Sequence, residues 1–213
     1  MKKKKLFNVI GVMTGTSMDG IDISYVSTDG IKKIIIYNEK SYQYSIKEIQ
    51  NIKKFILIKK YPKDIIRNQD TKITKLIVKY LSKFLKEFKV KKFDYISLSG
   101  QTIFHNPDKK ISIQLGNANF VSKTFKTSVI SNFRENDIKN GGQGAPIGAF
   151  YHKLLLDKIN KKAVLINLGG VANFALTHRR KFISSDMGPA NAPVSYTHLR
   201  AHETPEHRGC RVG

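Results

Sequence analysis

The sequence predicts an α/β protein, and three patterns favour that class. Short apolar and β-branched runs recur along the chain, several with the period-two alternation that is typical of strands. The segment 63–88 instead carries apolar residues at helical spacing. Strands come first and are followed by this helix and then by mixed elements, an order that indicates an α/β architecture.

Three strands are expected at the start of the chain. Residues 6–13 are an apolar run that we interpret as a buried strand, and residues 21–28 alternate with period two. The turn signal Asp29-Gly30 precedes a third strand, 31–37. The chain therefore opens with a β-meander whose first connection is a Gly-rich loop.

One long helix and several shorter elements should follow. The helix 63–88 has a single apolar face, made by Ile73, Leu76, Ile77, Tyr80, Leu81, Phe84, Leu85 and Phe88. Further strands are expected at 93–98, 111–115, 127–131, 163–168 and 172–177, with a second helix at 147–157 after the start signal Pro146.

Composition narrows the functional classes. With 213 residues, 40% of them hydrophobic, the chain can build a sizeable core. The basic start at residues 2–5 leads into a short apolar run and a polar loop, which we interpret as a strand and not a signal peptide. No apolar run reaches 18 residues, so no membrane span is expected. The single cysteine, Cys210, excludes a disulfide framework and fits the cytoplasm.

The formal net charge of +22 raises the question of nucleic-acid binding. The lysines are scattered, and many fall on the polar face of a predicted helix, so we interpret them as a solvated surface. No specific nucleic-acid partner is expected, although a basic anion-binding protein stays open as an alternative.

Residues 193–213 differ in composition from the rest of the chain, since they contain no lysine. His198, His202, His207 and Cys210 lie there, but their spacing matches no common zinc module, and no metal site is assigned. The string Ser195–Thr204 is similar to translated sequencing-adapter sequence. We therefore interpret 193–213 as a non-native tail, with an unusual native terminus as the alternative.

A Gly-rich loop after the first strand is the first candidate site. Gly15 and Gly20 permit a tight turn, in which backbone N–H groups and the hydroxyls between the glycines can bind phosphate oxygens. Asp19 and Asp22 are candidates to orient the loop or to hold a hydrated Mg²⁺. An ordinary Gly-rich hairpin is the alternative, because no P-loop motif is present.

Three later segments carry polar side chains. Gln101, Thr102 and His105 follow a predicted strand, where the ligand sites of α/β sheets gather, although a lone histidine is more often structural. Arg134 precedes a glycine turn and could bind a carboxylate, unless the segment is a surface loop. Asp186 is expected at a strand end before a turn, where it is either a general base or a turn-former.

Together these segments resemble the anhydro-N-acetylmuramic acid kinase family over residues 6–192. The matching motifs are G-T-S-x-D-G at 15–20, G-Q-T at 100–102, F-R-x-x-D…G-G-Q-G-A-P at 133–146, N-x-G-G-x-A-N at 167–173 and D-x-G-P-x-N at 186–191. The sequence departs from the family pattern before Gly100, at Ser131-Asn132 and at Met187, and none of these departures removes the candidate base.

The resemblance implies an actin-like ATPase fold of the ribonuclease H-like type, with two lobes around a cleft. Residues 1–131 would form the first lobe with its phosphate-binding loop. Residues 132–192 would start a second lobe that is incomplete in this chain and carries the catalytic aspartate.

The implied reaction converts 1,6-anhydro-N-acetylmuramic acid, water and ATP with Mg²⁺ to N-acetylmuramic acid 6-phosphate, in peptidoglycan recycling. Alternatives are a kinase for another anhydro sugar such as levoglucosan, and an inactive fragment; the 213-residue chain itself is expected to be inactive. A homodimer of the full-length protein stays open. The implied roles are catalysis for Asp186, nucleotide binding for Gly15, Thr16, Ser17, Met18, Asp19, Gly20, Ile21 and Asp22, and substrate binding for Gln101, Thr102, Arg134, Asp137 and Asn191.

Overall fold

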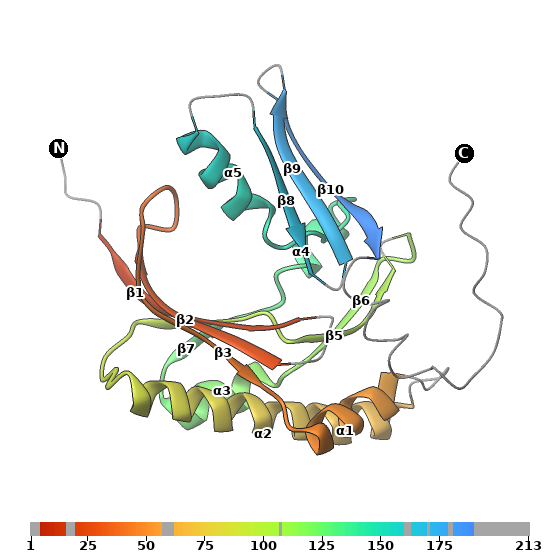
Figure 1. The fold of residues 1–213 in the computed structure, drawn as a ribbon. Helices are drawn as coiled ribbons and strands as arrows, with labels where there is room; N and C mark the ends of the chain where they lie inside the picture. The colour runs from red at the N-terminus through yellow and green to blue at the C-terminus, as the bar shows by residue number, and fades with distance from the viewer. Residues whose placement is uncertain are drawn as a thin grey trace.

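The structure is a computed structural model that describes residues 5–15, 20–56, 62–106, 108–159, 163–169, 171–178 and 181–189. Within these ranges the strands form a five-stranded sheet, a three-stranded sheet and a two-stranded hairpin (Figure 1). This arrangement confirms the mixed α/β class that the sequence predicts.

The five-stranded sheet has the order β3-β2-β1-β4-β7. Its meander consists of β1 (Phe7–Thr14), β2 (Gly20–Thr28) and β3 (Ile34–Gln43), which pair antiparallel. Strand β4 (Tyr95–Leu98) runs parallel to β1, and β7 (Ser128–Ile130) runs parallel to β4. Because β1 and β4 are parallel neighbours, the loops that leave their carboxyl ends start at the same edge of the sheet.

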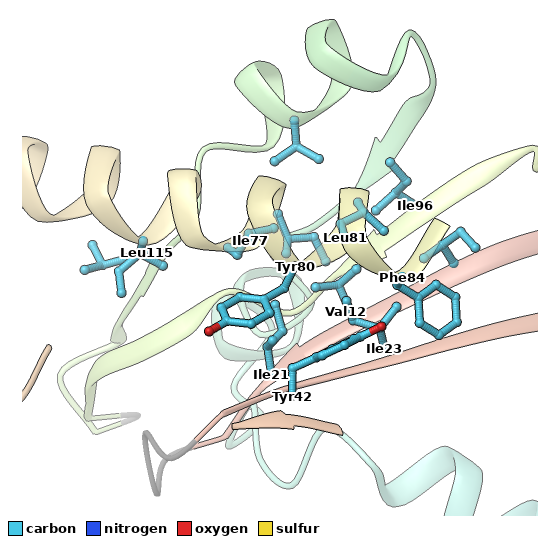
Figure 2. Close-up of a cluster of buried hydrophobic side chains, with 14 of the residues drawn as sticks. Val12, Ile21, Ile23, Tyr42, Ile77, Tyr80, Leu81, Phe84, Ile96 and Leu115 are labelled. Carbon is cyan, nitrogen blue, oxygen red and sulfur yellow. The ribbon is translucent and has the colours of Figure 1, made fainter. Parts of the chain in front are cut away.

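Three helices lie on one face of this sheet: α1 (Ile46–Ile56), α2 (Lys63–Glu87) and α3 (Ala118–Phe125) (Figure 1). The apolar face of α2 packs on the meander and on β4, as Figure 2 shows. Among the most completely buried side chains of this core are Ile10, Ile21, Ile23, Ile77, Leu81, Phe84 and Ile96. These three helices do not cover the opposite face of the sheet.

The second part of the chain lies across that opposite face (Figure 1). A hairpin of β5 (Gln101–Asn106) and β6 (Ile111–Leu115) leaves the first sheet. Beyond β7, α4 (Glu135–Lys139) and α5 (Ala149–Lys158) precede an antiparallel sheet. Its order is β10-β9-β8, with bounds Lys181–Pro189, Val171–His178 and Val164–Leu168.

Helix α5 packs on β9 and β8 of the second sheet. Val164, Ile166 and Leu168 alternate along β8 and are 57%, 55% and 65% exposed, and Ile183 of β10 is exposed as well. Val164 and Ile183 both pair with Leu176 of β9, so these side chains share one face. Among the described residues, this sheet therefore has an apolar face without a covering layer.

Most expected elements are present, with shifted ends. The Asp29-Gly30 turn is longer than a two-residue hairpin, because Asp29 Oδ1 accepts hydrogen bonds from the backbone N–H groups of residues 31–33, each at 2.9 Å, and β3 starts only at Ile34. Helices α1, α3 and α4 and strand β5 are additions to the sequence prediction, and β10 is the strand expected before Asp186, although it continues past that residue. The lobe boundary near residue 131 stays a prediction, and the 193–213 tail lies outside the described residues.

None of the helices in the described part of the chain has both the length and the apolar composition needed to cross a bilayer.

Glu48 joins α1 to α2 through a dense set of hydrogen bonds. Its carboxylate accepts from the Ser45 amide at 2.8 Å, from Tyr80 Oη at 3.0 Å and from Lys79 Nζ at 2.8 Å. Burial alone would raise the pKa of Glu48, but the bonds from Lys79, Ser45 and Tyr80 outweigh it and lower the pKa to about 2. The charged form is therefore favoured in the folded state.

We expect Glu48→Gln to lower the free energy of unfolding at pH 7 by roughly 1–3 kcal/mol. Since the folded-state pKa is depressed, this contribution is present above the unfolded value near 4.5 and is lost as the pH falls toward 2. Urea denaturation of wild type and variant from pH 7 to pH 2 measures the difference. A difference that grows on acidification would contradict this assignment.

Candidate active site

The loop between β1 and β2 is bounded by Gly15 and Gly20, and the fold constrains both residues. A Cβ at Gly20 would collide with the backbone carbonyl of Tyr42 on the neighbouring strand. Gly15 is held at its carbonyl oxygen by Gln101 Nε2, at 3.0 Å. Residues 16–19, which include the candidates Thr16, Ser17, Met18 and Asp19, lie outside the described residues. The two ends of the loop are thus fixed at the carboxyl edge of the first sheet.

Gln101 lies beneath this loop. Its side chain is fully buried, and its Oε1 has no hydrogen-bond partner among the described residues. Gly100 before it has φ +70°, and a Cβ there would lie 2.8 Å from the Leu115 carbonyl oxygen, so the tight step from β4 into β5 requires glycine. The sequence predicts substrate binding by Gln101 and Thr102; the contact to Gly15 also gives Gln101 a role in positioning the loop.

Ile21 and Asp22 follow the loop on β2 and face opposite sides of the sheet. Ile21 is fully buried in the core, so only its backbone is available to a nucleotide. Asp22 is exposed and pairs with Met13 of β1. Its carboxylate therefore lies on the face of the sheet that α2 does not cover.

Arg134 and Asp137 hold the same peptide segment from two sides. Arg134 Nη1 donates to the Gly144 carbonyl at 2.8 Å, and the Gly144 amide donates to Asp137 Oδ2 at 2.6 Å. Gly144 has φ +66°, and a Cβ there would lie 2.8 Å from the Ile138 side chain. These contacts fold the glycine turn back onto α4, and the predicted substrate-binding roles of Arg134 and Asp137 stay predictions beside this structural one.

Asp186 lies within β10 and not at a strand end before a turn, which corrects the sequence interpretation. Its partner on β9 is Asn173, whose own partner on β8 is Asn167. The ladder shifts register between Asp186 and Gly188, so a β-bulge replaces the expected turn. Asn167, Asn173 and Asp186 thus form a polar row across the second sheet, while the candidate Asn191 lies outside the described residues.

Asp186, Arg134 and His105 form one electrostatic cluster. Burial lowers the pKa of the Arg134 guanidinium, and Asp186 partly offsets this effect. Burial and then Arg134 lower the pKa of His105, while Asp186 and a backbone hydrogen bond to Gln143 act in the opposite direction. The guanidinium keeps its charge at neutral pH, whereas the imidazole is held in its neutral form.

Strand β5 links this cluster to the Gly-rich loop between β1 and β2. It carries Gln101 against Gly15 at one end and His105 beside Arg134 and Asp186 at the other. The structure therefore brings together candidates that lie far apart in the sequence. From the sequence, His105 is a candidate only through its place after a predicted strand. Asn167 and Asn173 are not among the predicted site residues, although they stand at the ends of the N-x-G-G-x-A-N motif.

The sheet order, with a Gly-rich loop between the first two strands and a second smaller sheet across from it, is that of an α/β protein of the actin-like ATPase superfamily. The sequence model of the anhydro-N-acetylmuramic acid kinase family matches residues 7–205, and the chain belongs to this family. The match includes residues 193–205, and the prediction that 193–213 is a non-native tail stays untested.

Curated relatives support the same assignment. The chain is 38% identical over 199 residues to the anhydro-N-acetylmuramic acid kinase of Pelagibacter ubique, covering 88% of this chain and 53% of the relative. The proteins of the same name from Sulfurimonas denitrificans and Zymomonas mobilis are 34% and 30% identical, covering 88% and 87% of this chain and 51% and 54% of their own lengths. The chain thus spans about half the length of the curated relatives it matches.

Proposed function

We propose that the full-length protein containing this chain is an ATP-dependent kinase. It would convert 1,6-anhydro-N-acetylmuramic acid and water to N-acetylmuramic acid 6-phosphate, with ADP as the second product, in peptidoglycan recycling in the cytoplasm. The observation that carries this proposal is the link through β5 between the phosphate loop and the cluster of His105, Arg134 and Asp186. Family membership supports the reaction class.

In this proposal Asp186 takes a proton from the attacking water. The water oxygen bonds to the anomeric carbon, the bond from that carbon to O6 breaks, and O6 accepts the γ-phosphoryl group of ATP. Asp186 is exposed on β10, so its carboxylate is accessible to water and substrate. The backbone around Gly15 and Gly20 would hold the phosphates, because phosphoryl transfer depends mainly on positioning and charge stabilisation.

Mg²⁺ is proposed to arrive with ATP and to neutralise charge on its phosphates. The exposed carboxylate of Asp22 fits this requirement, since Mg²⁺ prefers oxygen ligands and keeps several waters. Within the described ranges no three His, Cys, Asp or Glu side chains gather into a metal site, so the ion would be held largely through ATP and water.

Arg134 favours a muramic substrate over levoglucosan. The lactyl carboxylate distinguishes muramic sugars, and Arg134 offers a half-buried cation whose Nε has no partner among the described residues. Comparing turnover of anhydro-N-acetylmuramic acid with anhydro-N-acetylglucosamine, which lacks the lactyl group, tests this choice. A preference for the muramic sugar that persists in Arg134→Met would contradict the role of Arg134.

We expect Gly15→Val and Asp19→Ala to raise the KM for ATP or to abolish turnover while the fold is retained, because both alter the proposed phosphate loop. Gln101→Leu should raise the KM for ATP by roughly tenfold, since it removes one hydrogen bond that holds Gly15. Steady-state kinetics of the full-length protein at varied ATP, with circular dichroism as the check on folding, measure both effects. Unchanged ATP kinetics in all three variants would show that the loop does not contact nucleotide.

A further inference from the structure

The second sheet carries apolar side chains on both faces, and the described residues cover only one of them. On one face, Val164, Ile166 and Leu168 of β8 are each more than half exposed. On the other face, Ala175 of β9 is fully buried. Since α5 packs on β9 and β8 through a helix that buries Leu156, it covers the face of Ala175.

The strand sequences are typical of a sheet that is covered on both sides. Strand β8 begins with the unbroken apolar run Val164-Leu165-Ile166, whereas a strand with one solvated face alternates apolar and polar side chains. Ile183 of β10 belongs to the exposed face, because it shares its partner Leu176 with Val164. Contiguous exposed apolar side chains mark interaction surfaces in proteins. These side chains form the open face: Val164, Ile166, Leu168 and Ile183.

The first sheet contains the same meander and shows how such a face is covered. Strands β1, β2 and β3 are consecutive antiparallel neighbours, and β8, β9 and β10 repeat this order. In the first sheet the chain passes from β3 into α1 and α2, which lie on one face of the sheet (Figure 1). In the second sheet β10 is the third strand, and it is the last element that the structure describes. An equivalent helical layer would therefore follow β10 in the sequence.

The full-length protein has sequence from which such a layer can form. The chain matches the N-terminal part of its curated relatives and covers 53% of the Pelagibacter ubique protein. A segment that continues the polypeptide starts beside the open face, because β10 is an edge strand of this sheet. Tethering gives such a segment an effective concentration on the order of millimolar, whereas a second copy binds only at its free concentration.

We propose that the open face is the docking surface for a helical layer formed by the segment of the full-length protein that follows this chain. The apolar side of that layer packs on β8 and β10 and turns the open face into core. Ile183 lies three residues before Asp186 on β10, so the layer also supports the strand that carries the proposed base. The proposal does not depend on the proposed kinase activity.

Photo-crosslinking in the full-length protein identifies the occupant of the open face. With p-benzoylphenylalanine in place of Ile166, irradiation should give crosslinks within one polypeptide to a peptide that follows residue 213, identified by mass spectrometry. The control carries the same group in place of Ile46, which is 77% exposed on α1 on the far side of the first sheet (Figure 1), and should give no such crosslink. Crosslinks between two copies, crosslinks to residues 190–213, or none at all would overturn the proposal.

A conservative substitution measures the burial of the open face without a bulky probe. Ile166→Thr should lower the thermal midpoint of the full-length protein by about 2–6 °C, because it places a hydroxyl group in an apolar layer. Ile46→Thr is the matched control and should shift the midpoint by no more than about 1 °C. Equal midpoints for the two variants would contradict a covered open face. Neither measurement uses the kinase reaction, so a failure of the proposed function leaves both results valid.

Discussion

Phe84→Ala is expected to destabilise the chain by about 3–5 kcal/mol, the range for removing a fully buried aromatic side chain. Phe84 is 0% exposed on the sheet-facing side of α2, and its ring lies 4.7 Å from that of Phe88. Truncation would leave a cavity in the layer between α2 and the first sheet (Figure 2). Urea denaturation should show a lower midpoint with an unchanged slope.

Phe150→Ala is the matched control, because it makes the same chemical change on α5, where Phe150 is 83% exposed. Phe150→Ala should change the free energy of unfolding by no more than about 0.5 kcal/mol. If both variants lost the same free energy of unfolding, the packing between α2 and the first sheet would not be the main contribution to stability.

The structure explains why α2 could be predicted and α3 could not. The apolar face of α2 repeats over many turns, so its period is visible in the sequence. Helix α3 is short, and its start depends on Asn117, whose side chain accepts from the Phe120 amide at 2.9 Å. Helix α1 does carry a start signal in the sequence, the capping box of Ser45 and Glu48.

The candidate site could be predicted in its parts but not in its assembly. Asp186 and Arg134 can be selected as candidate residues from the sequence motifs, because each stands in a characteristic polar segment. Their proximity depends on how the second sheet lies across the first, and local patterns carry no information on that packing. Gly188-Pro189 predicts a turn after Asp186, because this pair is a usual turn signal, whereas the structure has a bulge there.

The environment of His105 likewise could not be predicted from local sequence patterns. A lone histidine in a polar segment does not by itself indicate a function, and the sequence predicts a loop at this position. Its position on β5 opposite Ser112, together with Arg134 and Asp186 from other elements, gives it a specific environment. That environment arises only from tertiary structure.

Asp186→Asn in the full-length protein is expected to lower kcat by roughly 10²–10⁴-fold, the usual contribution of a positioned general base. Asparagine keeps the shape of the side chain but cannot take a proton from water, so the KM values for sugar and ATP should change far less than kcat. Asp157→Asn is the matched control, because Asp157 is an exposed carboxylate on α5 that pairs only with Lys153 among the described residues. Its kcat should remain that of the wild type.

Oxygen from labelled water distinguishes this mechanism from simple ATP hydrolysis. If Asp186 directs water to the anomeric carbon, the ¹⁸O label should enter the hydroxyl group at that carbon of N-acetylmuramic acid 6-phosphate, and the phosphate should stay unlabelled. In Asp186→Asn the labelled sugar should fall in proportion to kcat, because the same water is no longer deprotonated. Label in inorganic phosphate would mean that the water attacks ATP, and Asp186 would then be the base of an ATPase and not of a sugar kinase.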